Sequence, residues 1–205
     1  MTASAIALTA IVCLLTMYSS RGETGVFLTT SSPSGTYRVT LSGGQHRPRV
    51  PLIDHVVFIG VSKFGKTVFQ NKELYSGDWL DASFDDWYPQ HQWVSDQSLV
   101  FYKDQFRQDL PNDTITLKNE SQKRIAFLKI RSVDLLLIFE FEPHASTSLQ
   151  VSRSRTDSTW VSVTGEFEGG QQIPTSTMSF DAPKNSGPLS LHILVSESGT
   201  TISRN

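Results

Sequence analysis

Apolar residues after position 23 recur either at every second position or in short unbroken runs, and this spacing is what most constrains the fold. Residues 36–41 and 114–117 alternate with a period of two, which is typical of strands with one buried face. Residues 55–61 and 133–141 are nearly continuous β-branched, aliphatic and aromatic runs, which indicates central strands covered on both faces. After position 23, no long window keeps the i, i+3, i+4, i+7 apolar spacing of a helix. The pattern therefore predicts an all-β protein.

Further strand patterns, separated by turns that contain glycine, give about ten strands in all, at the spacing of an antiparallel β-sandwich. The C-terminal half, from Thr114 onward, carries about seven of them, which is the number in a small immunoglobulin-like sandwich. The predicted fold class is an all-β, antiparallel β-sandwich that is immunoglobulin-like in its C-terminal half and is preceded by an N-terminal hydrophobic leader helix. The further strand segments are residues 67–70, 99–103, 125–130, 148–152, 160–167, 177–180 and 189–195.

The first residues form an uncharged, mostly apolar segment over 3–18, with polarity beginning at Ser19. This length suits a secretory signal and is shorter than the roughly 20 residues that a membrane-spanning helix needs. No Lys or Arg precedes the segment and Arg21 follows it, so an uncleaved and inverted anchor stays open as an alternative. We expect either a cleaved signal peptide over 1–22 or an N-terminal anchor, and a third interpretation, neither of these, also stays open. The expected location is extracytoplasmic, secreted or periplasmic, with membrane attachment through 3–18 if the leader is retained.

The remaining chain reads as one β-sandwich domain over 23–196, with a sub-boundary near 104–113, where a polar stretch interrupts the strand patterns. The polar tail over 197–205 is expected to be disordered. Cys13, the only cysteine, lies in the leader, so a mature chain would have no disulfide and no thiol nucleophile. Such a domain has to be stabilised by its hydrophobic core.

Charge and short motifs exclude several classes of function. The net charge of −2 and the scattered Lys and Arg residues lack the basic footprint of a nucleic-acid binder. Histidine spacings typical of zinc sites, the Gly-x-Ser-x-Gly elbow and phosphate-binding glycine loops are all missing from the sequence. We therefore expect no catalytic residues, no metal and no cofactor. The sequons at Asn112 and Asn119 would be used only in a eukaryotic secretory pathway.

One segment, residues 76–96, concentrates acids and aromatic rings between two predicted strands. Its carboxylates could bind Ca²⁺, its rings could stack on sugars, or two acids could form a glycosidase pair. The favoured interpretation is a loop that anchors itself, because Trp and Tyr rings pack while Asp residues accept hydrogen bonds from turn N–H groups. The candidate ligand-binding residues are Asp78, Trp79, Asp81, Asp85, Asp86, Trp87, Tyr88, His91 and Trp93.

The sequence thus favours an exported, non-catalytic β-sandwich module that binds a ligand or has a structural role at the cell envelope. The expected partner is a protein or a glycan, with no nucleic acid, and with membrane contact only through an uncleaved N-terminal segment. The alternative is a carbohydrate-binding or carbohydrate-active protein that uses residues 76–96. A third hypothesis is an assembly subunit that pairs through an exposed edge strand at 189–195, where the strand carries little charge.

Overall fold

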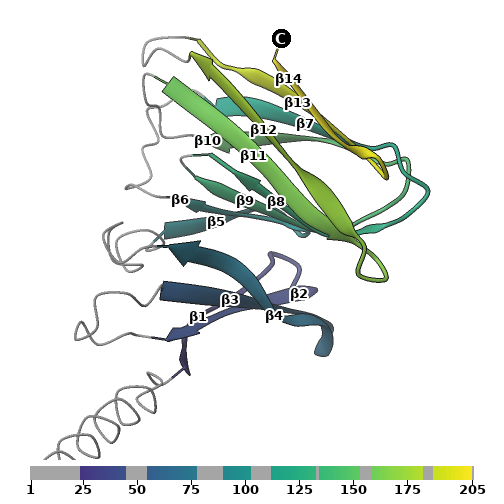
Figure 1. Ribbon diagram of the computed structural model, residues 1–205. Helices are drawn as coiled ribbons and strands as arrows, with labels where there is room; N and C mark the ends of the chain where they lie inside the picture. The colour runs from purple at the N-terminus through teal and green to yellow at the C-terminus, as the bar shows by residue number, and fades with distance from the viewer. Residues whose placement is uncertain are drawn as a thin grey trace, which may run out of the picture. The chain divides into compact units, whose positions relative to one another are not determined.

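The computed structural model describes residues 24–44, 55–77, 90–102, 112–132, 134–152, 158–181 and 187–204. Within these residues the chain forms fourteen β-strands in three sheets and no helix, so the all-β prediction is confirmed (Figure 1). The strands fall into two compact units, β1–β4 in the first and β5–β14 in the second, and the turn residues 32–36 belong to the second. The division between the two units comes before Ser83. Most of the predicted sub-boundary near 104–113 lies outside the described residues. The leader lies outside the described residues.

The first unit is a four-stranded antiparallel sheet in the order β1-β2-β3-β4. Residues of β2 and β3 that lie opposite each other share a face, and the pair Val39 and Val61 marks the buried face. The period-two pattern in the sequence is therefore the alternation between this buried face and the other face. The strands are β1 Thr24–Ser31, β2 Tyr37–Gly44, β3 His55–Lys63 and β4 Lys66–Gly77.

The second unit contains a six-stranded sheet in the order β12-β11-β8-β9-β6-β5 and a four-stranded sheet in the order β10-β7-β13-β14. β13 runs parallel to β7, and the other ladders of this unit are antiparallel. The strands are β5 Gln90–Ser95, β6 Ser98–Tyr102, β7 Asn112–Asn119, β8 Ile125–Arg131, β9 Leu135–Phe141, β10 Ser146–Ser152, β11 Ser158–Phe167, β12 Gln172–Asp181, β13 Ser190–Ser196 and β14 Gly199–Arg204.

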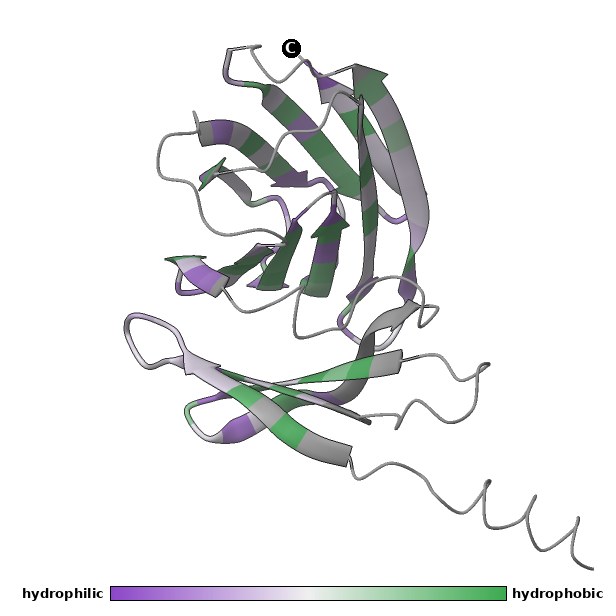
Figure 2. Ribbon diagram, turned by 90° about the vertical axis from the view of Figure 1, so that its left-hand side faces the viewer, coloured by the Kyte–Doolittle hydropathy of each residue, from purple (hydrophilic) through white to green (hydrophobic). Residues whose placement is uncertain are grey.

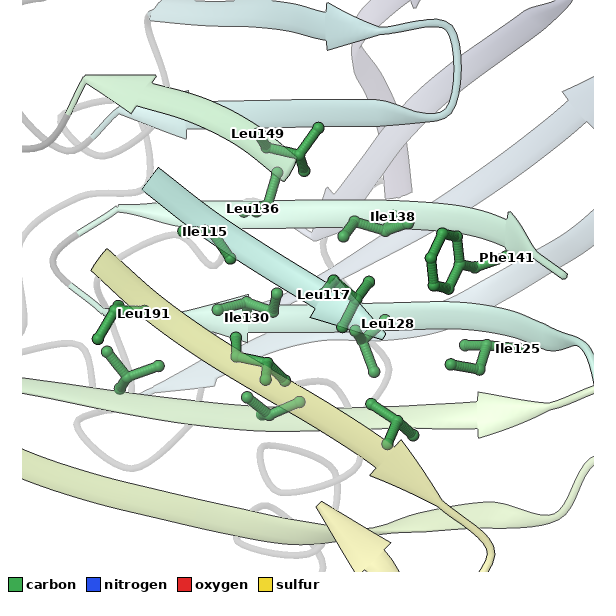
Figure 3. Close-up of a cluster of buried hydrophobic side chains, with 14 of the residues drawn as sticks. Ile115, Leu117, Ile125, Leu128, Ile130, Leu136, Ile138, Phe141, Leu149 and Leu191 are labelled. Carbon is green, nitrogen blue, oxygen red and sulfur yellow. The ribbon is translucent and has the colours of Figure 1, made fainter. Parts of the chain in front are cut away.

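A single hydrophobic core fills the space between these two sheets (Figure 3). Leu117 of β7 and Ile193 of β13 come from the four-stranded sheet, whereas Leu128 of β8 and Ile138 of β9 come from the six-stranded sheet. Hydrophobic and polar residues alternate along several of these strands, as the colours in Figure 2 show. β9 departs from this alternation, since its first five residues are all buried. That observation confirms the prediction of a central strand at this place in the chain.

The C-terminus corrects two expectations. The tail predicted to be disordered forms β14, which pairs in register with β13 from Ser196↔Gly199 to Leu191↔Arg204. Ile202 packs against the core, so this short polar strand is stabilised by one apolar side chain and by the ladder. β13 consequently lies between β7 and β14 and is not an edge strand. The edge-strand hypothesis at 189–195 is therefore wrong.

The end of β7 is closed by one buried asparagine. Asn119 is 0% exposed, and its Nδ2 donates to the carbonyl oxygens of Lys123, Phe141 and Glu142 at 2.9, 3.3 and 3.0 Å. Its Oδ1 accepts hydrogen bonds from the backbone N–H and the hydroxyl of Ser121 at 3.1 and 2.7 Å. One side chain thus joins the β7–β8 connection to the end of β9. The sequon at this position is a structural motif, because its amide nitrogen is buried and engaged.

Candidate functional site

The structure describes two of the nine candidate ligand-binding residues, and both lie in β5. The ring of His91 is 6.0 Å from that of Phe101, its partner in β6, and is tilted by 41°. Trp93 is half-buried, with its ring 6.2 Å from that of Phe139. These two rings pack against side chains of β6 and β9 in the same sheet, as an anchoring role requires. The candidates outside the described residues are Asp78, Trp79, Asp81, Asp85, Asp86, Trp87 and Tyr88.

The last acid of segment 76–96 also has a structural role. Asp96 follows β5, and its Oδ1 accepts a hydrogen bond from the backbone N–H of Ser34 at 3.0 Å; both residues belong to the second unit. The hydrogen bond from this N–H lowers the pKa of the Asp96 carboxyl. This is the contact that the favoured interpretation assigns to aspartates in the segment: a carboxylate that caps a turn.

The environment of His91 leads to a pH prediction. Burial lowers the pKa of His91 from its ordinary value of 6.5, because the charged imidazolium loses hydration. The unfolded chain therefore binds a proton at His91 more readily than the folded chain does, and the free energy of unfolding should fall as the pH drops below about 6.5. His91→Phe keeps a ring against Phe101 and should reduce this pH dependence. Urea unfolding of the parent protein and of His91→Phe at several pH values above and below 6.5 measures this dependence. The same change of unfolding free energy with pH in both proteins would contradict the assignment to His91.

One exposed aromatic residue that sequence reasoning missed is Trp160 in β11. Its side chain is 41% exposed, while its neighbours in the strand, Val161 and Val163, are buried in the core. The guanidinium of Arg131 in β8 lies 5.7 Å from the centre of the indole, within the range of a cation–π contact. The sequence held a signal for this placement, because Trp160, Ser162 and Thr164 alternate with the buried valines. These residues therefore share the opposite, polar face of the sheet.

Register extends this polar face across three strands. Ser162 lies opposite Arg131 of β8 and Thr177 of β12, and the Thr177 hydroxyl donates to the Ser162 hydroxyl at 3.4 Å. Two further cross-strand pairs add hydroxyl groups and one more cation to the same face. We call this surface the Trp160 face. It comprises Lys129, Arg131, Trp160, Ser162, Thr164, Thr177 and Ser179.

Two buried carboxylates lie inside the second unit and do not form part of an open, solvent-accessible site. Asp113 and Asp134 are 1% and 6% exposed and line an interior cavity of about 30 Å³. The backbone N–H of Leu189 donates to Asp113 Oδ1 at 2.8 Å, so this acid fixes the start of the chain that leads into β13. A cavity of this size suits an ordered water and not an organic substrate.

Tyr102, the last residue of β6, is buried and lies near enough to Asp134 to feel its charge. Burial, reinforced by the negative charge of Asp134, raises the pKa of Tyr102 to about 12. Its hydroxyl donates to Gln92 Oε1 at 2.9 Å.

In the part of the chain that the structure describes, His, Cys, Asp and Glu form no group of three or more able to hold a metal ion. The described residues also include no helix that is long and apolar enough to cross a membrane.

Comparison with known proteins adds no relative: no family model, no curated protein and no solved structure matches this chain.

Proposed function

We propose that this chain is an exported, non-catalytic β-sheet module that binds its ligand on the Trp160 face. The observation that carries the proposal is the exposed indole of Trp160, which Arg131 contacts beside serine and threonine side chains of β11 and β12. Exposed tryptophan is unfavourable in water, and Trp and Arg are the side chains most enriched among residues that dominate binding. The flat row of hydroxyls beside them offers donors and acceptors for a polar ligand.

Export rests on the leader sequence, whose apolar run over 3–18 has the length of a signal peptide. The proposal does not need the immunoglobulin-like order expected for the C-terminal half. In that order, counted from β7, the second and fifth strands would pair in the sheet of the first strand. Here β8 and β11 lie in the six-stranded sheet, whereas β7 lies in the four-stranded one. The binding face therefore belongs to a sheet with its own strand order.

A glycan is the ligand class that this face suits best. Sugar rings stack their C–H faces on exposed indoles, and their hydroxyls exchange hydrogen bonds with Ser, Thr, Lys and Arg side chains. On the Trp160 face these groups lie opposite one another in the paired strands β8, β11 and β12. The carbohydrate-binding alternative is thus retained, but it moves from segment 76–96 to β8, β11 and β12. A carbohydrate-active enzyme would need a carboxylate pair across a cleft, and this proposal includes none.

The test is a glycan array followed by titration of the best ligand. Trp160→Ala should weaken binding at least tenfold, because the stacking platform is removed, while stability changes by less than about 1 kcal/mol, since the ring is exposed. Gln150→Ala, an exposed change in β10 of the other sheet, is the control and should bind normally. Glycan binding that survives Trp160→Ala would refute the proposed face.

A further inference from the structure

The tip of the β3–β4 hairpin combines features that are each unfavourable in water. Phe64 is 76% exposed, and it has a positive φ of 48° beside Gly65 at 76°. Positive φ at both central residues is the geometry of a type I′ turn, which strongly prefers Asn, Asp or Gly at the first of them. A phenylalanine here is strained by its Cβ and displays a large apolar ring. Strain of this kind is kept where the residue has a function.

The hairpin tip also brings two positive charges together. Lys63 and Lys66 flank Phe64 and Gly65 and lie directly opposite each other in the ladder. Like charges in directly opposed positions destabilise a strand pair. The Lys63 ammonium lies 5.3 Å from the centre of the Tyr37 ring, so it stays close to the tip. The tip is therefore an aromatic side chain between two cations.

The charges along the chain are also unevenly distributed, with a net positive charge in the region that contains this hairpin. Residues 24–77, which include β1–β4, hold six Lys or Arg and two acidic residues, a net charge of +4. Residues 78–205 hold eleven Lys or Arg and seventeen acidic residues, a net charge of −6. The basic sheet directly follows the apolar leader in sequence. The net positive charge is thus in the part of the chain closest in sequence to the apolar leader.

We propose that the Lys63–Lys66 hairpin tip docks on an anionic lipid surface, with the Phe64 ring at the boundary between headgroups and acyl chains. The exposure of the ring and the repulsion between the two lysines are then offset, because the ring leaves water and both ammonium groups face phosphate headgroups. A bilayer fits better than a protein partner, since a specific protein interface buries roughly 1,000 Å² or more and a two-residue tip offers far less. This contact goes beyond the proposed ligand-binding function, and it is separate from any attachment through the leader.

The test measures the surroundings of the hairpin tip itself, because the leader could bring any variant of the protein to a vesicle. In the full chain with Cys13→Ser, Thr67→Cys carries an environment-sensitive NBD dye; Thr67 is exposed and adjoins the tip. Vesicles that contain phosphatidylglycerol should shift NBD emission to the blue, and vesicles of phosphatidylcholine alone should not. The same dye on Ser198→Cys, in the turn between β13 and β14, should not respond. Raising the salt concentration should weaken the response.

Two variants separate docking from folding. Phe64→Gly should abolish the blue shift and raise the melting temperature, because glycine accepts the positive φ without strain. Lys66→Ser should weaken the apparent vesicle affinity about fivefold, the loss expected for one lysine near an anionic surface. An equal shift with phosphatidylcholine, no shift at all, or an unchanged shift in Phe64→Gly would overturn the proposal.

Discussion

Asn119→Asp should lower the free energy of unfolding by about 3–5 kcal/mol at neutral pH, although the two side chains have almost the same shape. The Asn119 amide donates to three carbonyl oxygens and is 0% exposed. A carboxylate would turn a second oxygen toward these acceptors and would place a charge where water is absent. Equilibrium urea unfolding with an unchanged m-value is the measurement.

The pH dependence of this variant distinguishes the charge from the geometry. Burial among carbonyl oxygens should raise the pKa of the new carboxyl above that of the unfolded chain. The folded state then binds the proton more tightly, so stability should recover as the pH falls and decline as it rises through the folded pKa. Asn119→Ala also loses the hydrogen bonds but should lack this recovery. Equal pH profiles for the two variants would show that a buried charge is not what destabilises Asn119→Asp.

The sequence located most of the strands, because their pattern reports burial. β3 is an exception in its burial, since half-buried Phe58 and Gly60 alternate with buried residues where both faces were predicted to be covered. Alternation in residues 36–41 and the apolar run in 133–141 became β2 and β9, with the burial that each pattern predicts. The sequence pattern did not predict β14, because Gly199–Arg204 is polar and has only Ile202 as an apolar anchor. That strand is stabilised by its hairpin ladder with β13, and backbone pairing of this kind leaves no hydrophobic pattern in the sequence.

The candidate site was harder to predict for a related reason. Trp93 lies in a dense cluster of aromatic residues, yet it packs against Phe139 and is only half-exposed. Trp160 is isolated in the sequence, and its significance depends on Arg131, which lies in a different strand. For Trp93 the sequence cluster coincides with packing, whereas the exposure of Trp160 required knowledge of which strand face is buried. Segment 76–96 keeps its candidate residues as a prediction.

Gly165→Ala should lower the free energy of unfolding by about 3 kcal/mol, the upper part of the range for overpacking. A Cβ at Gly165 would lie 2.5 Å from the carbonyl oxygen of Phe127, 2.9 Å from Leu128 Cδ1 and 3.1 Å from Ile173 Cδ1. The side-chain methyls could move, but the carbonyl belongs to the β8–β11 ladder, so the backbone itself would have to shift. The register shift between Val163 and Gly165 in the β11–β12 pair lies at this close approach.

Gly187→Ala is the matched control, because a Cβ there would meet nothing within 4 Å. Both substitutions reduce the freedom of the unfolded chain equally, so their difference isolates the clash. Urea unfolding should show the control within about 0.5 kcal/mol of the parent protein. Ile173→Val added to Gly165→Ala should recover only a small part of the loss, because the nearest atom is the carbonyl oxygen of Phe127. Full recovery would mean instead that side-chain crowding, and not the approach of β8 to β11, makes glycine necessary at this position.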